Sequence, residues 1–253
     1  MTENQYILSA IKKHALDSTR SSSALRAALR LHPMIRRWAG SYLLKIVPTG
    51  SFAKRTAIKG TTDIDLFISL SSKTPFTLVE IYGSLSDYLK KIGYPVREQN
   101  VSIGIDSNNF KIDLVPAKKQ AGSLWDHSIY RRKAKTWIKT NVNRHIVLVR
   151  NSSRLNEIRA MKVWRNLHNL EFPSFYLELS VINALKGCMP FRLASNIIRV
   201  LGYLSDDFVD ARIEDPANSN NVVSDDLTRE ERLEVAKAAY SSLEERFWEQ
   251  IIW

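Results

Sequence analysis

The sequence predicts an α+β fold, with a mixed sheet and flanking helices in the first part of the chain and helices in the second. Two observations carry this prediction. Short runs of alternating apolar and polar residues lie between positions 45 and 115, and such alternation is typical of strands. Beyond position 151, apolar residues recur at helical spacing. We expect a sheet-bearing domain, residues 1–150, packed on a helical domain, residues 151–253, with the active site in the cleft between them.

The expected elements of the first domain follow from the spacing of apolar residues and from the positions of cap, proline and glycine residues. We expect helices at 5–17, 23–31 and about 34–42, with Ser21, Ser22 and Ser23 as candidate caps and an interruption at Pro33. Strands are expected at 45–48 and 62–70, then a helix from Thr74-Pro75 to Gly93 and a hairpin with arms 101–105 and 110–115.

The second part of the chain has fewer strand signals. Residues 116–151 are basic and are expected to be irregular, with helices following at 154–170, 174–186, 191–204 and 228–250. Pro173-Ser174 and the Thr228–Glu231 capping box mark two of the helix starts. We expect both Trp137 and Trp164 to be packing residues.

Composition and charge limit the function classes. Of the 253 residues 44% are hydrophobic, which is ordinary for a soluble globular protein. Cys188 is the single cysteine, which excludes an internal disulfide and argues against a thiolate metal site. The apolar stretches are too short to span a membrane, and the first residues lack a secretory pattern. We therefore expect a cytoplasmic protein with no membrane partner. The sequence does not decide its oligomeric state.

The net charge of +11 is unevenly distributed. From residue 117 to 168, thirteen Lys and Arg face two acidic residues, whereas from 205 to 253 five Lys and Arg face thirteen acidic residues. Such separation is typical of a basic face that meets polyanions. RNA is therefore a candidate ligand or substrate for the stretch 117–168, although nucleoside triphosphates alone would also call for positive charge.

Two aspartates near position 60 are the most informative residues. Asp63 and Asp65 are separated by one apolar residue, so on a strand both carboxylates point to the same face. Two adjacent carboxylates repel each other, and a divalent cation such as Mg²⁺ relieves that cost. Twelve residues before Asp63, Gly50-Ser51 forms a turn whose backbone N–H groups suit a phosphate. Metal and phosphate together indicate nucleotide chemistry.

A third aspartate completes the set. Asp113 lies between Ile112 and Leu114 on the second arm of the expected hairpin, which repeats the apolar–Asp–apolar pattern. Three aspartates on neighbouring strands suit two-metal phosphoryl transfer, in which one ion activates a 3′-hydroxyl and the other holds the triphosphate and its leaving pyrophosphate. We therefore expect Asp63, Asp65 and Asp113 to be both catalytic residues and metal ligands.

These motifs resemble the signature of the nucleotidyltransferase superfamily that includes DNA polymerase beta. The fuller string at residues 50–60, GSFAKRTAIKG, is similar to the branch that holds oligoadenylate synthases, archaeal-type CCA-adding enzymes and the bacterial cyclic-oligonucleotide synthases of anti-phage signalling (CD-NTases). The resemblance implies a nucleotidyltransferase palm as the catalytic domain, a helical domain that completes the nucleotide pocket, and two Mg²⁺ or Mn²⁺ ions. The glycine that usually precedes Thr56 is Arg55 here, so the loop is less glycine-rich.

The resemblance extends to three later segments. The helix around Lys162 resembles the one whose lysine grips the donor triphosphate, and Ser174 stands where a serine hydroxyl meets the same phosphates. Asp215 opens a segment similar to the Asp-Pro loop that closes the nucleotide pocket. Together with Gly50 and Ser51, these are the expected nucleotide-binding residues. The structural alternatives are an exposed helix lysine for Lys162, a helix N-cap for Ser174 and a simple turn for Asp215.

Three functions follow as hypotheses. The first is a template-independent nucleotidyltransferase that joins NTPs, with ATP as the expected substrate, into a cyclic or linear oligonucleotide and releases pyrophosphate. The missing tRNA-binding tail and the Pro173–Leu179 segment favour it. The second is an RNA-terminal transferase of the CCA-adding kind, which the basic stretch favours. The third, a silent RNA-binding module, predicts a broken aspartate set, whereas all three aspartates are present.

Overall fold

The computed structural model describes residues 1–16, 22–59 and 63–253. Ser21, Gly60 at the end of the motif string and Thr62 at the start of the expected strand therefore lie outside the described residues. The chain forms two compact units. The sheet unit comprises residues 17–54 and 62–146, and the helical unit comprises residues 1–16, 55–61 and 147–253. The predicted α+β class is confirmed.

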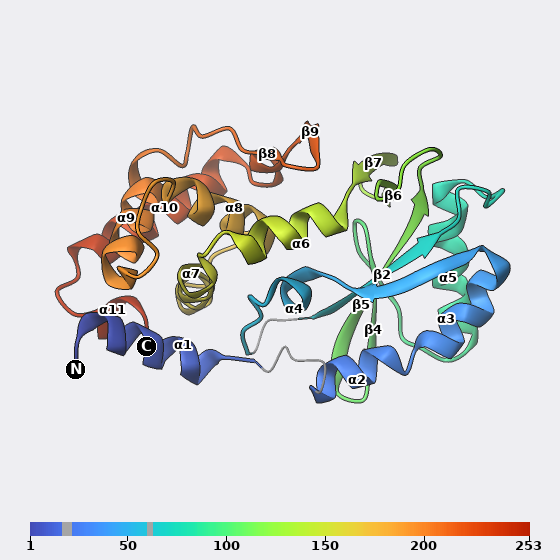
Figure 1. Ribbon diagram of the computed structural model, residues 1–253, viewed down its shortest axis with the longest axis horizontal. Coiled ribbons are helices and arrows are strands. Elements are labelled where there is room, and N and C mark those ends of the chain that lie inside the picture. The colour runs from blue at the N-terminus through green and yellow to red at the C-terminus, as the bar shows by residue number, and fades with distance from the viewer. Residues whose placement is uncertain (17–21, 60–62) are drawn as a thin grey trace. The chain divides into compact units, whose positions relative to one another are not determined.

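A mixed sheet forms the centre of the sheet unit (Figure 1). In the described residues its order is β1-β2-β5-β4-β3, and β6 pairs with β5 and β7. β2 and β5 are parallel, whereas the other pairs are antiparallel. The strands are β1 Leu43–Pro48, β2 Ile64–Leu70, β3 Arg97–Glu98, β4 Ile103–Ser107, β5 Phe110–Lys119, β6 His127–Arg131 and β7 Thr136–Thr140. A parallel pair needs a long connection, and the one from β2 to β5 contains α5.

Two helices of the sheet unit, α2 and α5, begin at side-chain caps, and only the first of these caps was expected. They are α2 Ser23–Leu29, α3 His32–Ala39, the 3₁₀ turn Gly40–Tyr42, α4 Gly50–Lys54 and α5 Leu78–Lys91. Ser22 caps α2, as expected. Pro33 lies in the first turn of α3 and does not interrupt it, because that position needs no backbone N–H. The predicted start of α5 at Thr74-Pro75 is wrong, because Thr77 and Glu80 form a capping box three residues later.

The expectation of an irregular segment from 116 to 151 is also wrong. This stretch continues β5 and then forms the β6–β7 hairpin and α6, Val142–Asn151. Ala117, Ile129 and Ile138 are register partners across three strands and pack against Phe67. The basic side chains between these inward positions obscured the alternation. Trp137 on β7 is 57% exposed, so it is not the packing residue that the sequence suggested.

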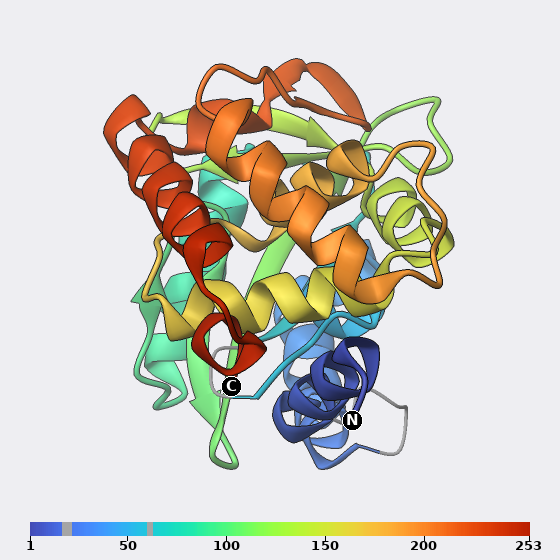
Figure 2. The ribbon, with the colours of Figure 1, turned by 90° about the vertical axis from the view of Figure 1, so that its left-hand side faces the viewer.

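The helical unit is built around a large apolar core. Its helices face the viewer in Figure 2. Its elements are α1 Glu3–His14, α7 Leu155–Leu167, α8 Ser174–Ala184, α9 Leu193–Asp206, the hairpin β8 Glu214–Asp215 and β9 Asn218–Val222, the 3₁₀ turn Val223–Asp226, α10 Arg229–Glu244 and α11 Trp248–Ile251. Trp164 is fully buried, as expected, and its indole N–H donates to Ser242 Oγ of α10 at 2.9 Å. The single helix expected at 228–250 is interrupted at Glu245, which has extended backbone.

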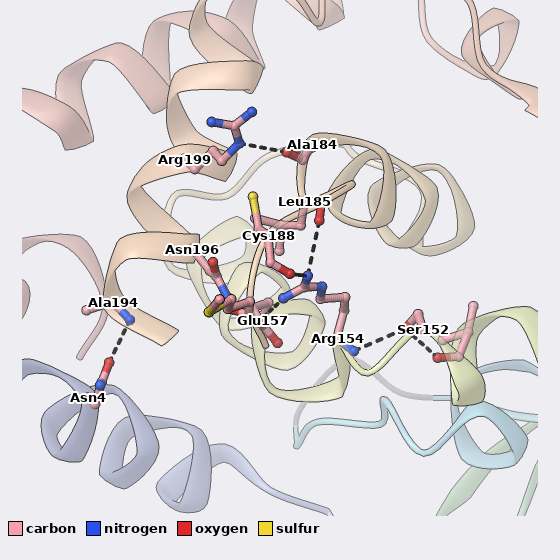
Figure 3. A network of polar contacts seen from close by, with 12 residues as sticks. Asn4, Ser152, Arg154, Glu157, Ala184, Leu185, Cys188, Ala194, Asn196 and Arg199 are labelled. Atoms are coloured by element: carbon pink, nitrogen blue, oxygen red, sulfur yellow. Dashed lines mark hydrogen bonds and ion pairs between the residues drawn. The ribbon is translucent and has the colours of Figure 1, made fainter. Parts of the chain in front are cut away.

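A buried polar network ties the start of α7 to the segment between α8 and α9 (Figure 3). The Arg154 guanidinium lies 3.3 Å from Glu157 Oε1 and donates to the backbone carbonyls of Leu185 and Cys188. Asn196 of α9 donates to the same Glu157 oxygen at 2.8 Å. Both charged side chains are less than a tenth exposed, so each depends on the other for charge compensation.

Among the described residues, no helix combines the length and the apolar character that crossing a membrane requires.

We predict that Glu157→Ala lowers the free energy of unfolding by about 3–5 kcal/mol, because it leaves the Arg154 charge buried without its carboxylate. The matched control is Asp210→Ala, which breaks the exposed pair with Arg229 and is expected to cost less than about 1 kcal/mol. Denaturant titrations of the three proteins check this. Equal losses in the two variants would show that the buried pair contributes no more than a surface pair.

Candidate active site

Asp65 and Asp113 are direct register partners on the parallel strands β2 and β5. The residues on either side of each aspartate are buried, with exposures of 0 to 1%: Ile64, Leu66, Ile112 and Leu114. A slip of one residue would move these apolar side chains out of the core, so the core determines the register that aligns the two aspartates. Asp63 lies immediately before β2, two residues from Asp65. The convergence of the carboxylates on one part of the sheet therefore agrees with the sequence pattern.

Asp113 is 7% exposed, and its surroundings disfavour the ionised form. Burial raises the pKa of Asp113 to about 6, and the negative charge of Asp63 acts in the same direction. The hydroxyl of Ser102 and the amide of Gln99 donate to its two oxygens at 3.3 and 3.0 Å, which partly opposes the rise. Asp63 and Asp113 are thus close enough for their charges to repel each other, which is also the case for carboxylates that bind one cation.

Gly50 lies directly against the Asp65 carboxylate. A Cβ added at Gly50 would be 1.7 Å from Asp65 Oδ2, and Gly50 has φ of +60°, which favours glycine. The Thr49 N–H donates to the Asp65 carbonyl oxygen at 2.8 Å. The expected turn is the first turn of the short helix α4, so Gly50 and Ser51 stand where helical N–H groups lack intrahelical acceptors. The sheet unit therefore brings together Gly50, Ser51 and the aspartates.

The donor set fits a divalent cation that also binds substrate. Within the described residues, no group of three or more His, Cys, Asp or Glu side chains is placed so that it could hold a metal ion by itself. Mg²⁺, however, is usually held by one or two carboxylates together with waters and substrate phosphates. The aligned pair Asp65 and Asp113, with Asp63 alongside, supplies the carboxylate oxygens that such a cation prefers.

Lys162 of α7 is buried in the helical unit and 2% exposed. Its ammonium donates to Glu178 Oε1 of α8 at 2.7 Å and to Thr56 Oγ1 at 2.9 Å, and the Thr56 hydroxyl donates to the same carboxylate oxygen at 2.7 Å. Lys162 therefore connects α7, α8 and the segment that follows α4. Its binding of a triphosphate stays a prediction.

Arg55, where the related families usually have glycine, adopts φ of +63°. That conformation is strained for a residue with a side chain. Arg159 of α7 stabilises it, because two guanidinium nitrogens donate to the Arg55 carbonyl oxygen at 3.0 and 2.7 Å. The segment after α4 is thus held twice by α7, through Arg159 and, one residue later, through Lys162 on Thr56.

Ser174 is the first residue of α8, and Pro173 occupies the N-cap position, so the alternative of Ser174 as an N-cap is wrong. The Ser174 hydroxyl accepts a hydrogen bond from Arg165 of α7 at 3.0 Å. Arg165 also donates to the Phe172 carbonyl at 2.7 Å. A cationic side chain therefore already lies beside the hydroxyl that the resemblance assigns to phosphate.

Asp215 is 5% exposed and shapes the β8–β9 hairpin. Its carboxylate accepts from the Ala217 N–H at 2.8 Å and from the Asn221 amide at 3.3 Å. These contacts satisfy the structural alternative of a turn-forming aspartate. They leave the closing of a nucleotide pocket as a prediction.

Sequence reasoning missed the partners of these residues. Gln99 and Ser102 hold Asp113, and Gly104, its register partner on β4, would place a Cβ 3.0 Å from Asp113 Oδ1. A glycine inside a strand was the available signal, because it often marks a close approach. Glu178 had a signal too, since it is the single charged residue of α8.

No protein-family model matches the chain. The chain is 25% identical over 169 residues to the cyclic AMP-AMP-AMP synthase of Escherichia coli strain MS 115-1. That match covers 59% of this chain and 52% of the synthase, so the chain spans about half the length of this curated relative.

Solved structures match over nearly the whole chain. The structure of E. coli MS115-1 CdnC with ATP has a TM-score of 0.79 and 20% identity, covering 95% of this chain and 90% of that one. The Bradyrhizobium diazoefficiens CD-NTase CdnG in complex with GTP has a TM-score of 0.77 and 14% identity, covering 96% and 90%. These findings agree with the resemblance to the CD-NTase branch, and the fold of this chain is that of the CD-NTase structures.

Proposed function

We propose that this chain is a template-independent, metal-dependent nucleotidyltransferase that joins NTPs, ATP among them, into a cyclic or linear oligonucleotide second messenger of anti-phage signalling. The observation that carries the proposal is the lateral alignment of Asp65 and Asp113, with Asp63 beside them and Gly50 against Asp65. The matched synthase makes a cyclic trinucleotide, and solved relatives hold ATP or GTP.

The chain's own groups have distinct roles in this proposal. Two divalent ions at Asp63, Asp65 and Asp113, either Mg²⁺ or Mn²⁺, would supply the positive charge that acidifies a 3′-hydroxyl and neutralises the leaving pyrophosphate. Asp113 orients the attacking hydroxyl by accepting its hydrogen bond, and the backbone N–H groups of Gly50 and Ser51 bind phosphate oxygens. The buried strands on which the aspartates stand keep the carboxylates in position before substrate binds.

Further roles rest on the resemblance alone. Lys162 and Ser174 are proposed to bind the donor triphosphate and Asp215 to position the loop that closes over the nucleotide. We propose the sheet unit as the catalytic domain, acting in the cytoplasm. The helical domain expected at 151–253 then also takes in residues 1–16 and 55–61, which the expected range 1–150 had included in the catalytic domain. The comparisons give no support to the CCA-adding alternative, and we do not propose it.

The first prediction concerns the aspartates. Incubated with labelled NTPs and Mg²⁺ or Mn²⁺, the protein is expected to form a small phosphatase-resistant product, and Asp63→Ala or Asp65→Ala to reduce that product to background. Asp87→Ala, an exposed aspartate of α5, is the matched control and should keep full activity. Chromatography of the products checks this. If only an added tRNA grows, or if the Asp63 and Asp65 variants keep turnover, the assignment is wrong.

The second prediction concerns Gly50. Gly50→Ala places a methyl group on the Asp65 carboxylate and strains a left-handed backbone, so we expect loss of product and lower stability by about 1–2 kcal/mol. Gly83→Ala in α5 has open space around the new Cβ and should raise stability by about 0.4–1 kcal/mol with unchanged activity. Parallel activity assays and denaturation curves distinguish the two. An active Gly50→Ala protein would contradict the described contact.

The third prediction is a pH dependence. Because the pKa of Asp113 is raised from 3.8 to about 6, its contribution to stability is full below the lower value and is lost as the pH rises through the higher. In EDTA, Asp113→Asn should therefore stabilise the protein relative to the parent at about pH 8 more than at about pH 5. Denaturation midpoints at both pH values check this. Added Mg²⁺ at the higher pH should favour only the parent, and a gap independent of pH would refute the raised pKa.

A further inference from the structure

The sheet unit contains a cavity away from the aspartates. Its volume is about 340 Å³, and it is open to solvent and lined by the C-terminal end of β5, the β6–β7 hairpin and the start of α5. Lys118 of this cavity lies five residues beyond Asp113 along β5, which corresponds to roughly 16 Å of extended chain. The cavity is therefore separate from the proposed catalytic site, and its use does not depend on the proposed function.

The walls combine an aromatic ring with positive charge. Trp137 of β7 lines the cavity and is 57% exposed, although it stands in a regular strand. Its cross-strand neighbour Tyr130 is anchored by an edge contact with Tyr82 of α5, with ring centroids 5.7 Å apart. The strand that presents Trp137 is therefore held in place while the indole itself faces solvent. An exposed indole on a fixed strand offers a stacking surface.

The charge around the cavity is of one sign. Lys118 lines it on the face of the sheet that carries Trp137, and the lining contains no acidic residue. The Lys118 ammonium uses one donor on the Phe76 carbonyl at 3.0 Å, which holds it at the cavity and leaves further N–H groups for a ligand. The acidic residue in the first turn of α5, Glu80, accepts hydrogen bonds from Thr77. An anion is thus the complementary ligand.

The positive charge continues beyond the cavity. Residues 127–140, which form the β6–β7 hairpin, contain five Lys and Arg and no acidic residue. A free mononucleotide would use only Lys118 of the cavity. A strand with several phosphates would also engage the hairpin, where Lys133 and Lys135 are exposed.

We propose that this cavity binds one unpaired nucleotide of a single-stranded RNA. The base stacks on Trp137, a neighbouring phosphate contacts Lys118, and further phosphates follow the β6–β7 hairpin. A base stacks on the indole only when its own face is free, which is the case in a single strand and not inside a duplex. Base identity is not selected, since every base has a face that stacks.

The experiment measures binding of a labelled, unstructured RNA oligonucleotide by fluorescence anisotropy, in EDTA and without NTPs, so that catalysis plays no part. Loss of one stacking contact is worth about 1–3 kcal/mol, so Trp137→Ala should weaken binding between about 5-fold and about 150-fold. Lys118→Ala should reduce the slope of log K against log salt by roughly 0.7. Trp137→Phe should keep most of the affinity and serves if the alanine variant is less stable.

Two controls match these variants. Trp125→Ala removes a tryptophan of similar exposure, 52%, which contacts Lys45 and does not line the cavity. Lys91→Ala removes an exposed lysine at the far end of α5. Both should bind RNA like the parent.

Four outcomes overturn the proposal: no RNA binding by the parent, equal losses in the Trp125 and Trp137 variants, equal affinity for a duplex of the same sequence, or displacement of the RNA by AMP at matched concentration. The last would identify a free nucleotide as the ligand.

Discussion

The parallel pairing of β2 with β5 is the constraint on which the candidate site depends. It is a non-local contact, because a long connection through α5 separates the two strands in sequence. The buried residues on either side of Asp65 and Asp113 hold the register, so the energy that aligns the two carboxylates comes from hydrophobic burial rather than from any interaction between them. The sheet imposes the alignment on groups that would otherwise separate.

That alignment has an electrostatic cost which the fold reduces only in part. Ser102 and Gln99 each donate a hydrogen bond to Asp113, which lowers its pKa. Burial and the Asp63 charge have the larger effect, so the pKa of Asp113 is still raised. Local instability of this kind is common at functional sites, where the surrounding structure holds charges together for a ligand to neutralise. The close approach of Gly50 and Gly104 to the carboxylates belongs to the same arrangement.

Much of the fold and the aspartate set could be predicted because the signals are local. Alternation around Asp65 and Asp113 identifies two strands, and helical spacing identifies α7 to α10. The start of α5 was missed because two capping signals compete within a few residues, and only tertiary context selects Thr77. The β6–β7 hairpin was missed because lysines and arginines fill its outward positions. The ion pair of Lys162 with Glu178 could not be foreseen, since it joins two helices and a loop that no periodicity connects.

The path of the chain through the two units has a mechanical consequence. The backbone leaves the sheet unit after residue 54, contributes residues 55–61 to the helical unit, and returns just before Asp63. Gly50 and Asp63 therefore lie on either side of one segment that belongs to the helical unit. Within this segment, the Arg55 carbonyl and the Thr56 hydroxyl accept hydrogen bonds from α7. A displacement of α7 would therefore pull on the phosphate-facing turn and on the first aspartate together. For the same reason, no single backbone cut releases either unit as an intact piece of chain.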